Sequence, residues 1–278
     1  MTGWTRPLLM GVLNVTPDSF SDGGQFLEPA RALAQASMLS VQGAQIIDVG
    51  GESTRPGAVR VTPAEEQARI LPVIEAIKSD LSITISVDTM NAATARKAVK
   101  AGANIVNDIS GGLSDPQMFA AIQDLDCKYV LGHWRGHADK MESMAQYSDV
   151  AREVVAELAE QVAMAVAAGI SRSRIVVDPG LGFAKDIYQN WDLVNRLDEL
   201  EQLGLPVLVG ASRKRFLAHA LSAQDPASVS MPRRDVATAV LTALLLQRKL
   251  WGVRVHDVQS TSDAIAIVSS LKNHQETK

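Results

Sequence analysis

Eight short apolar runs, each followed by a turn and then by a segment of helical character, divide the chain into eight similar units. The runs cover residues 8–14, 46–49, 83–88, 105–110, 128–133, 175–178, 207–210 and 253–258. Helices are expected at about 28–42, from 62–63 onward, 92–101, from 116 onward, 149–168, 190–203, 235–250 and 262–271. Strands that alternate with helices form a parallel sheet, and eight such units close into a barrel. The sequence therefore predicts the α/β class and a (β/α)8 TIM barrel.

The length of the chain agrees with one domain. It has 278 residues, and barrels of this kind use ~250 residues as a single unit. The apolar content of 46% supports a large core, and no linker or low-complexity segment interrupts the units. We expect a single domain over residues 1–278, with a core at about 7–271 and a short tail after it.

Charge and cysteine usage exclude several classes of function. The net charge of −4 disfavours a nucleic-acid partner, since such proteins normally present a basic face. The one cysteine, Cys127, cannot form an intrachain disulfide and is expected to be a packed thiol. The longest apolar helix, at residues 236–246, is too short to cross a membrane and is expected to be deep core or a subunit contact. With no secretory signal recognised, a cytoplasmic location is expected.

Polar residues gather at the carboxyl ends of the predicted strands, where barrels of this kind build their sites. These residues are Asn14, Asp48, Asp88, Asn107, His133, Asp178, Ser212 with Lys214, and Arg254 with His256. Any one of them alone reads more simply as a helix cap or a turn residue. That reading does not explain the whole set, so we expect a polar site at this end of the barrel.

Two chemistries are represented in the set. Asp88, Asn107 and Asp178 can accept hydrogen bonds from N–H groups, which suits a flat heterocycle with several ring and exocyclic nitrogens. Arg254 and His256 are two residues apart on a strand and therefore share a face. Arg55 and Lys214 add positive charge. With Arg254 and His256 they favour an anionic ligand such as a phosphate group.

Simpler readings hold for two other groups. The run 213–215, Arg-Lys-Arg, is by itself more typical of a solvated turn. His133 and His137 have a spacing that zinc-binding helices use, but Gly136 and the preceding strand disfavour a helix there.

Long motifs of the chain resemble those of the dihydropteroate synthase family. The two signature stretches are GVLNVTPDSFSDGG at residues 11–24 and DVGGESTRPG at residues 48–57. The resemblance continues through residues 86–89, 106–108, 178–183, 212–214 and 254–257 and covers about residues 7–270. The runs 133–135 and 212–216 resemble actinobacterial members most.

The resemblance implies a reaction that joins 6-hydroxymethyl-7,8-dihydropterin diphosphate to p-aminobenzoate, giving 7,8-dihydropteroate and pyrophosphate. It implies Mg²⁺ as the cofactor, small-molecule substrates as partners, and a homodimer. Within it, Asn14 would bind the metal, and Lys214, Arg254, His256 and Asp88 would be catalytic. The substrate-binding residues would be Thr54, Arg55, Asp88, Asn107, Asp178, Gly182, Phe183, Ser212, Lys214, Arg254 and His256.

Two alternatives remain open at this point. The chain could be a pterin-binding paralogue without synthase activity, or a pterin-dependent methyltransferase domain, which shares the barrel but does not need the diphosphate cations. Two departures from the family pattern bear on substrate affinity. Gly132 stands where close relatives often carry Met, and Arg215 replaces a small residue.

Overall fold

The computed structural model describes residues 6–16, 28–52, 61–137 and 143–276. In that part of the chain, strands and helices alternate as the sequence predicts. The strands are β1 (Leu8–Asn14), β2 (Ile46–Gly50), β3 (Thr84–Asp88), β4 (Ile105–Asp108), β5 (Lys128–Gly132), β6 (Ile175–Asp178), β7 (Leu208–Val209) and β8 (Gly252–Val255). The main helices are α1 (Glu28–Val41), α2 (Pro63–Asp80), α3 (Ala92–Ala101), α4 (Met118–Asp124), α5 (Val150–Ala167), α6 (Ile187–Asn195), α7 (Arg215–Leu221), α8 (Met231–Leu245) and α9 (Val258–Glu276).

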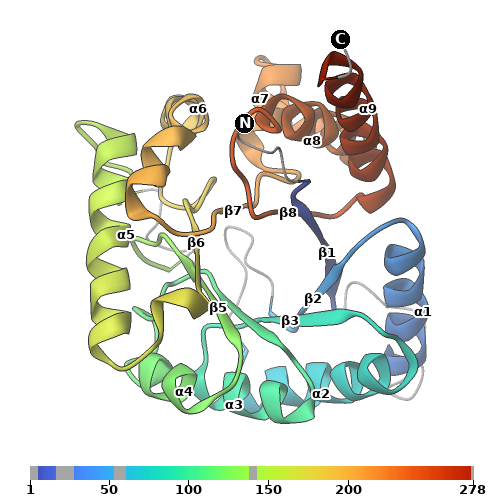
Figure 1. Ribbon diagram of the computed structural model, residues 1–278, viewed down its shortest axis with the longest axis vertical. Coiled ribbons are helices and arrows are strands. Elements are labelled where there is room, and N and C mark those ends of the chain that lie inside the picture. Colours follow the sequence, from blue (N-terminus) through green and yellow to red (C-terminus); the bar gives the residue numbers. More distant parts are fainter. Residues whose placement is uncertain (1–5, 17–27, 53–60, 138–142, 277–278) are drawn as a thin grey trace.

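The strands form one parallel ring. Their order is β6-β5-β4-β3-β2-β1-β8-β7, so each strand from β1 to β6 pairs with its chain neighbour and β1 also pairs with β8. A parallel bridge between Val177 and Val207 joins β6 to β7 and completes the circle. Figure 1 shows the helices arranged around the outside of this ring. The (β/α)8 barrel expected from the sequence is confirmed.

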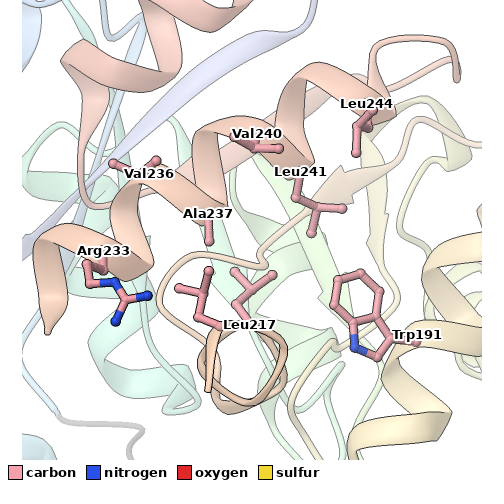
Figure 2. Close-up of a pocket in the computed structure, with 9 residues that line it drawn as sticks. Trp191, Leu217, Arg233, Val236, Ala237, Val240, Leu241 and Leu244 are labelled. Carbon is pink, nitrogen blue, oxygen red and sulfur yellow. The ribbon is translucent and has the colours of Figure 1, made fainter. Parts of the chain in front are cut away.

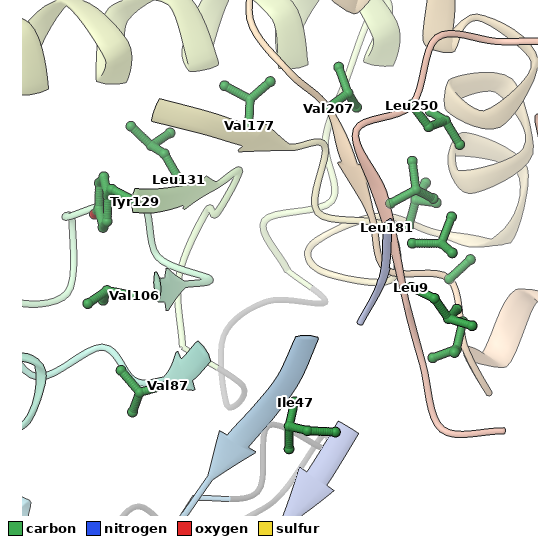
Figure 3. Close-up of a cluster of buried hydrophobic side chains, with 14 of the residues drawn as sticks. Leu9, Ile47, Val87, Val106, Tyr129, Leu131, Val177, Leu181, Val207 and Leu250 are labelled. Carbon is green, nitrogen blue, oxygen red and sulfur yellow. The ribbon is translucent and has the colours of Figure 1, made fainter. Parts of the chain in front are cut away.

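The main core lies between the strands and the helices. Outward-facing strand residues such as Leu9, Ile47, Val106 and Tyr129 are almost fully buried there. Figure 3 shows several of these side chains along successive strands. Alternate residues of a strand point to opposite faces, so the residues between them face the barrel interior.

The interior has an apolar floor with a polar layer next to it. The floor is a separate buried cluster of Met10, Ile46, Ile105, Val130, Val176 and Leu208. Two residues further along the same strands stand Val12, Asp48, Asn107, Gly132, Asp178 and Gly210. Because the side-chain period of a strand is two, this second layer also faces inward, at the carboxyl end of the barrel. The site therefore lies in this second layer, directly above the apolar floor.

Several boundaries differ from those predicted. The segment 215–221 is a helix, α7, although the run 213–215 reads as a turn; Lys214 stands just before its first residue. The expected helix at 190–203 is instead α6 followed by a 3-10 helix, Leu197–Leu203. The last strand ends at Val255, and α9 begins at Val258.

Thr62 caps the N-terminus of α2. Thr62 accepts a hydrogen bond from the Glu65 amide at 3.2 Å, with Pro63 as the first helical residue. The Glu65 side chain pairs with Arg69 rather than closing a capping box. A full capping box is present at α6, between Asp186 and Gln189. Within the described residues, no helix combines the length and apolar character that a membrane span requires.

Candidate active site at the carboxyl end of the barrel

Arg254 lies among carboxylates inside the barrel. Its Nε donates to Asp48 Oδ2 at 2.6 Å, and its Nη2 donates to Asp88 Oδ2 at 2.7 Å. Asn107 Nδ2 also donates to Asp48 Oδ2, at 3.0 Å. The inward-facing position of Arg254 on β8 directs its side chain into the barrel, where it reaches the carboxylates of β2 and β3.

The pKa values of the acidic residues reflect this crowding. Burial raises the pKa of Asp88 to about 7, with Arg254 acting against the shift and Asp48 adding to it. Burial also raises the pKa of Asp178, which the Gly180 amide, Lys214 and Arg254 oppose. Asp178 on β6 and Arg254 on β8 both hold inward-facing positions, so the two side chains lie at the same end of the barrel interior.

Asp178 ends β6 and begins a tight loop. Its Oδ1 accepts from the Gly180 amide at 2.7 Å. Further along the loop, the Phe183 ring lies under Lys214, with the Nζ atom 3.8 Å from the ring centroid. Burial lowers the pKa of Lys214 to about 8, and Asp178 opposes this shift. Asp178, Phe183 and Lys214 thus belong to one neighbourhood, as the sequence predicted.

Ser212 and His256 form a second pair on this side. The Ser212 hydroxyl lies 2.9 Å from His256 Nδ1 and accepts from the His256 amide at 3.1 Å. Between Ser212 and Lys214, Arg213 adopts a left-handed backbone with a φ of 61°. A two-bond ion pair from Arg213 to Asp235 on α8, with both distances 2.7 Å, holds this costly conformation.

The residues around Asn14 fit a magnesium ion. Asn14 pairs in register with Gly50, which pairs with Asp88. A side-chain carbon at Gly50 would lie 3.9 Å from Asn14 Oδ1 and 3.5 Å from the Asp88 Cβ, so the amide and the carboxylate flank the same glycine. Mg²⁺ prefers such oxygen donors and completes its shell with water and substrate phosphates. In the described residues, no three His, Cys, Asp or Glu side chains form a metal cluster of their own.

His133 does not face the site. It follows the outward-facing Tyr129 and Leu131 at the same parity, so its ring points toward α5, where Nε2 lies 2.9 Å from Glu157. Burial, assisted by Lys185, lowers the pKa of His133 to about 4. The inclusion of His133 among the site-facing strand ends was wrong, because the last residue of a strand can point to either face.

Gly132 is enclosed by backbone. A Cβ atom there would lie 2.7–2.9 Å from the backbone O, Cα and C atoms of Ile109. The loop after β4 therefore occupies the place of the missing side chain. Arg215, the other departure from the family pattern, is exposed at the start of α7.

The structure accounts for most of the residues predicted for the site. It brings together Asn14, Asp88, Asn107, Asp178, Gly182, Phe183, Ser212, Lys214, Arg254 and His256 at one end of the barrel. Thr54 and Arg55 lie outside the described residues. Sequence reasoning counted Asp48 among the polar strand ends without a specific role and did not single out Lys185 or Asn190; all three are buried and hydrogen-bonded beside the site. Asp48 was recognisable as an inward-facing strand end.

A groove of about 320 Å³ lies on the outer surface, away from the barrel interior. Its wall on α8 carries Val236, Val240 and Leu244, which are 60%, 55% and 63% exposed. Figure 2 shows these residues along α8, with Leu217 and Trp191 on the other side of the groove. Leu241, which also lines the groove, and Leu245 are buried on the same helix, so α8 contributes to both the core and the apolar surface.

Comparison with known proteins agrees with this arrangement. Residues 10–256 match the family described as pterin binding enzyme. The chain is 47% identical over 263 residues to dihydropteroate synthase of Mycobacterium leprae, covering 94% of this chain and 92% of that protein. It is 44% identical to the enzyme of Streptococcus pyogenes serotype M3, strain MGAS315, covering 95% of each.

Two solved structures of the Xanthomonas albilineans enzyme are also similar. The one with 4-aminobenzoic acid has a TM-score of 0.88 at 38% identity, covering 96% of this chain and 93% of that one. The one in complex with 7,8-dihydropteroate has a TM-score of 0.85 at 36% identity, covering 97% and 95%.

The barrel and its inward-facing acid, amide and arginine groups define a pterin-binding enzyme of the TIM-barrel class. The chain belongs, within that class, to the dihydropteroate synthase family. It is a transferase that condenses 6-hydroxymethyl-7,8-dihydropterin diphosphate with p-aminobenzoate to give 7,8-dihydropteroate and pyrophosphate. The similarity supports this activity rather than a pterin-binding paralogue without it.

Proposed function

We propose that the inward-facing polar layer binds the pterin ring and that the cations beside it bind the diphosphate. The observation that supports this most is the convergence of Asp88, Asn107, Asp178 and Arg254 from four strands on one end of the barrel. A planar ring with several N–H groups matches carboxylate and amide acceptors at that depth.

Asp178 has the central role in pterin recognition under this proposal. The Gly180 amide binds its Oδ1, and Oδ2 lies next to Gly210, which has no side chain to cover it. A carboxylate that accepts two N–H bonds from one ring edge forms charge-assisted bonds, each contributing about 1.5–3 kcal/mol. Asn107 and Lys214 contact the ring from its sides, and Phe183, Gly182 and Ser212 line the aminobenzoate side. The family resemblance assigns Thr54 and Arg55, which lie outside the described residues, to the same substrate.

Arg254 and His256 bind the diphosphate. The guanidinium has five N–H donors, of which Asp48 and Asp88 engage Nε and Nη2. The carboxylates fix the plane of the guanidinium, and its remaining edge faces the anion. Asn14 would hold Mg²⁺ across Gly50 from Asp88, and the ion supplies positive charge next to the leaving group when it is bound.

The chemistry places little demand on a base. The C–O bond between the pterin methylene and the diphosphate breaks, and the electron-rich ring stabilises the positive charge that develops. The arylamine nitrogen forms the new C–N bond and releases one proton to solvent or to pyrophosphate. Arg254, His256 and Lys214 stabilise negative charge on the leaving group, while Asp88 stabilises positive charge on the ring.

One assay tests this proposal. Purified protein is incubated with the pterin diphosphate, p-aminobenzoate and Mg²⁺, and pyrophosphate release is followed together with dihydropteroate formation. Release of pyrophosphate and formation of dihydropteroate at equal rates support the proposed bond changes. Pterin binding without pyrophosphate release contradicts them and favours the paralogue.

We further propose a homodimer built on α8. Val236, Val240 and Leu244 are spaced by four residues and form one apolar stripe along the groove. A second copy of the chain, related by a two-fold axis, would cover this stripe with its own. The cytoplasmic location and the single domain over residues 1–278 stay predictions from the sequence.

A further inference from the structure

Lys185 is a buried lysine to which neither the sequence motifs nor the proposed reaction gives a role. It stands at the end of the loop that follows β6, and it is 9% exposed. Its Nζ lies 3.0 Å from His133 Nδ1, 3.0 Å from the Gly180 carbonyl oxygen and 3.1 Å from the Phe183 carbonyl oxygen. An ammonium group has three N–H donors, so the three acceptors match it completely.

His133, the acceptor just after β5, is itself held in place by a second contact. His133 Nε2 lies 2.9 Å from Glu157 of α5, whose carboxylate also binds Arg135. Because Glu157 accepts from Nε2–H, Nδ1 of the neutral ring carries the lone pair that Lys185 needs. The chain Glu157–His133–Lys185 therefore connects α5 to the loop after β6.

The loop requires such ties because its backbone is strained at Ala184, which has a φ of 46°. Gly180 and Gly182, with φ values of 66° and 77°, adopt the same left-handed region without a steric cost. A left-handed conformation at a residue with a Cβ atom costs about 1–2 kcal/mol. Strained backbone persists only where its surroundings determine it several times over.

Asn190 of α6 provides the second tie. Its Oδ1 accepts from the Gly182 amide at 2.6 Å, and its Nδ2 donates to the Lys185 carbonyl at 3.1 Å. The side chains of Lys185 and Asn190, both buried, thus bind the loop backbone.

The loop determines where Lys214 lies. A Cβ atom at Gly182 would lie 2.7 Å from Lys214 Cδ, so the lysine stem rests against that glycine. The Phe183 ring lies under Lys214 Nζ at 3.8 Å. A shift of the 180–184 backbone therefore moves both Phe183 and the Lys214 ammonium.

We propose that Lys185 is a positioning residue, whose contacts with Gly180, Phe183 and His133 hold loop 180–184 in the shape that places the Phe183 ring and, against it, the Lys214 ammonium that contacts the pterin substrate. This inference rests on the proposed function for the role of Lys214, but the ordering of the loop does not. Lys185 has no part in bond making or breaking.

The test compares Lys185→Met with Arg174→Met. Arg174 lies just before β6 and donates to the carbonyl oxygens of Cys127 and Ile122 at 2.8 and 2.6 Å, so it too is a cation that binds backbone. It stands at the opposite end of the strand from the site. Both variants lose a cation and its carbonyl contacts, and only one of them touches the loop.

Two quantities are measured at pH 6.5, below the pKa of about 7 to which burial lowers Lys185. Lys185→Met is expected to weaken binding of the pterin diphosphate by about tenfold or more and to speed amide exchange at residues 181–184 by a similar factor. Arg174→Met is expected to lower the melting temperature while leaving both quantities within about twofold of the wild type.

Unchanged loop exchange in a folded Lys185→Met protein overturns the inference, as does equal loss of pterin binding in Arg174→Met at the same melting temperature. Where Lys185→Met does not fold, Lys185→Gln takes its place, since an amide reaches fewer acceptors and is expected to give a smaller change in the same direction. A wild-type protein that does not bind pterin refutes the proposed function, while the exchange rates still test the loop.

Discussion

Arg254 and Asp48, 206 positions apart in the chain, are joined inside the barrel by a 2.6 Å bond from Nε to Oδ2. The strands that carry them are not neighbours, because β1 lies between β8 and β2. The same Asp48 oxygen accepts from Asn107. Asp48 thus links a residue proposed for the pterin to one proposed for the diphosphate.

The Asp48→Ala substitution is predicted to destabilise the protein and to impair catalysis. Asp48 is fully buried, and loss of one partner of a buried ion pair typically costs about 3 kcal/mol or more. Urea unfolding measures the free energy of unfolding, and steady-state kinetics measures kcat and KM for the pterin substrate. Asp198→Ala is the control, since its pair with Arg248 is largely exposed and should change stability by less than about 1 kcal/mol. Equal effects from the two substitutions would remove the role assigned to Asp48.

The Asp178→Ala substitution is predicted to reduce pterin affinity by at least about a hundredfold, because two charge-assisted hydrogen bonds to the ring are lost. Titration calorimetry with the pterin diphosphate measures the change in Kd. Asp115→Ala serves as the comparison: Asp115 caps backbone amides of Ala92 and Gln117 outside the barrel and should leave Kd unchanged. An unaltered Kd in the Asp178 variant contradicts the assignment of the pterin site.

The limb of the wild-type pH–activity profile near pH 8 is predicted to belong to Lys214, separately from any loss near pH 7 that follows deprotonation of Lys185. Burial lowers the pKa of Lys214 to about 8, so the ammonium form that stabilises negative charge gives way to the neutral amine above that pH. Lys214→Met should lower kcat by at least about tenfold with the fold intact and should lose the alkaline limb. Lys214→Arg should move the limb to higher pH, because the guanidinium keeps its proton. Lys249→Met, at an exposed site, is the control, and a limb that persists in Lys214→Met would assign it to another group.

Leu244→Asp is predicted to convert the proposed homodimer to a monomer. The carboxylate would stand at the C-terminal end of the apolar stripe on α8, and desolvating it in the interface costs several kcal/mol. Sedimentation velocity measures the mass, and circular dichroism confirms that the barrel is retained. Ile267→Asp, on the exposed face of α9, is a comparison with the same change in charge. A wild-type chain that sediments as a monomer at micromolar concentration refutes the interface.

The sequence was sufficient for the barrel because its signals are local and repeat eight times. Apolar runs that end in Asp, Asn or Gly predicted both the strands and the end of the sheet that carries the site. His133 shows where this reasoning stops. A strand end predicts a position along the strand, but which face the last side chain takes depends on the register of the whole strand.

Side-chain contacts between distant segments of the barrel could not be predicted from the sequence for a different reason. Lys185 is the one lysine of the loop at residues 179–186, and only the fold brings His133 and two carbonyl oxygens to its ammonium. Similarly, α7 depends on packing, since Phe216 and Leu217 are buried while the segment itself is only seven residues long.

Gly132 and Gly210 belong to the same inner layer, and their substitution by Ala is predicted to change different properties, stability at Gly132 and pterin binding at Gly210. A Cβ atom at Gly132 would lie 2.7–2.9 Å from the Ile109 backbone, which has no flexible end to move aside. Gly132→Ala is therefore expected to destabilise the protein by about 1–3 kcal/mol. At Gly210 the Cβ atom would make an ordinary contact of 3.4 Å with Asp178 Oδ2, so Gly210→Ala should keep its stability while its methyl group weakens pterin binding. Urea unfolding and pterin titration on both variants separate the two effects, and a Gly132→Ala protein as stable as the wild type would show that the loop after β4 yields more easily than its close contact implies.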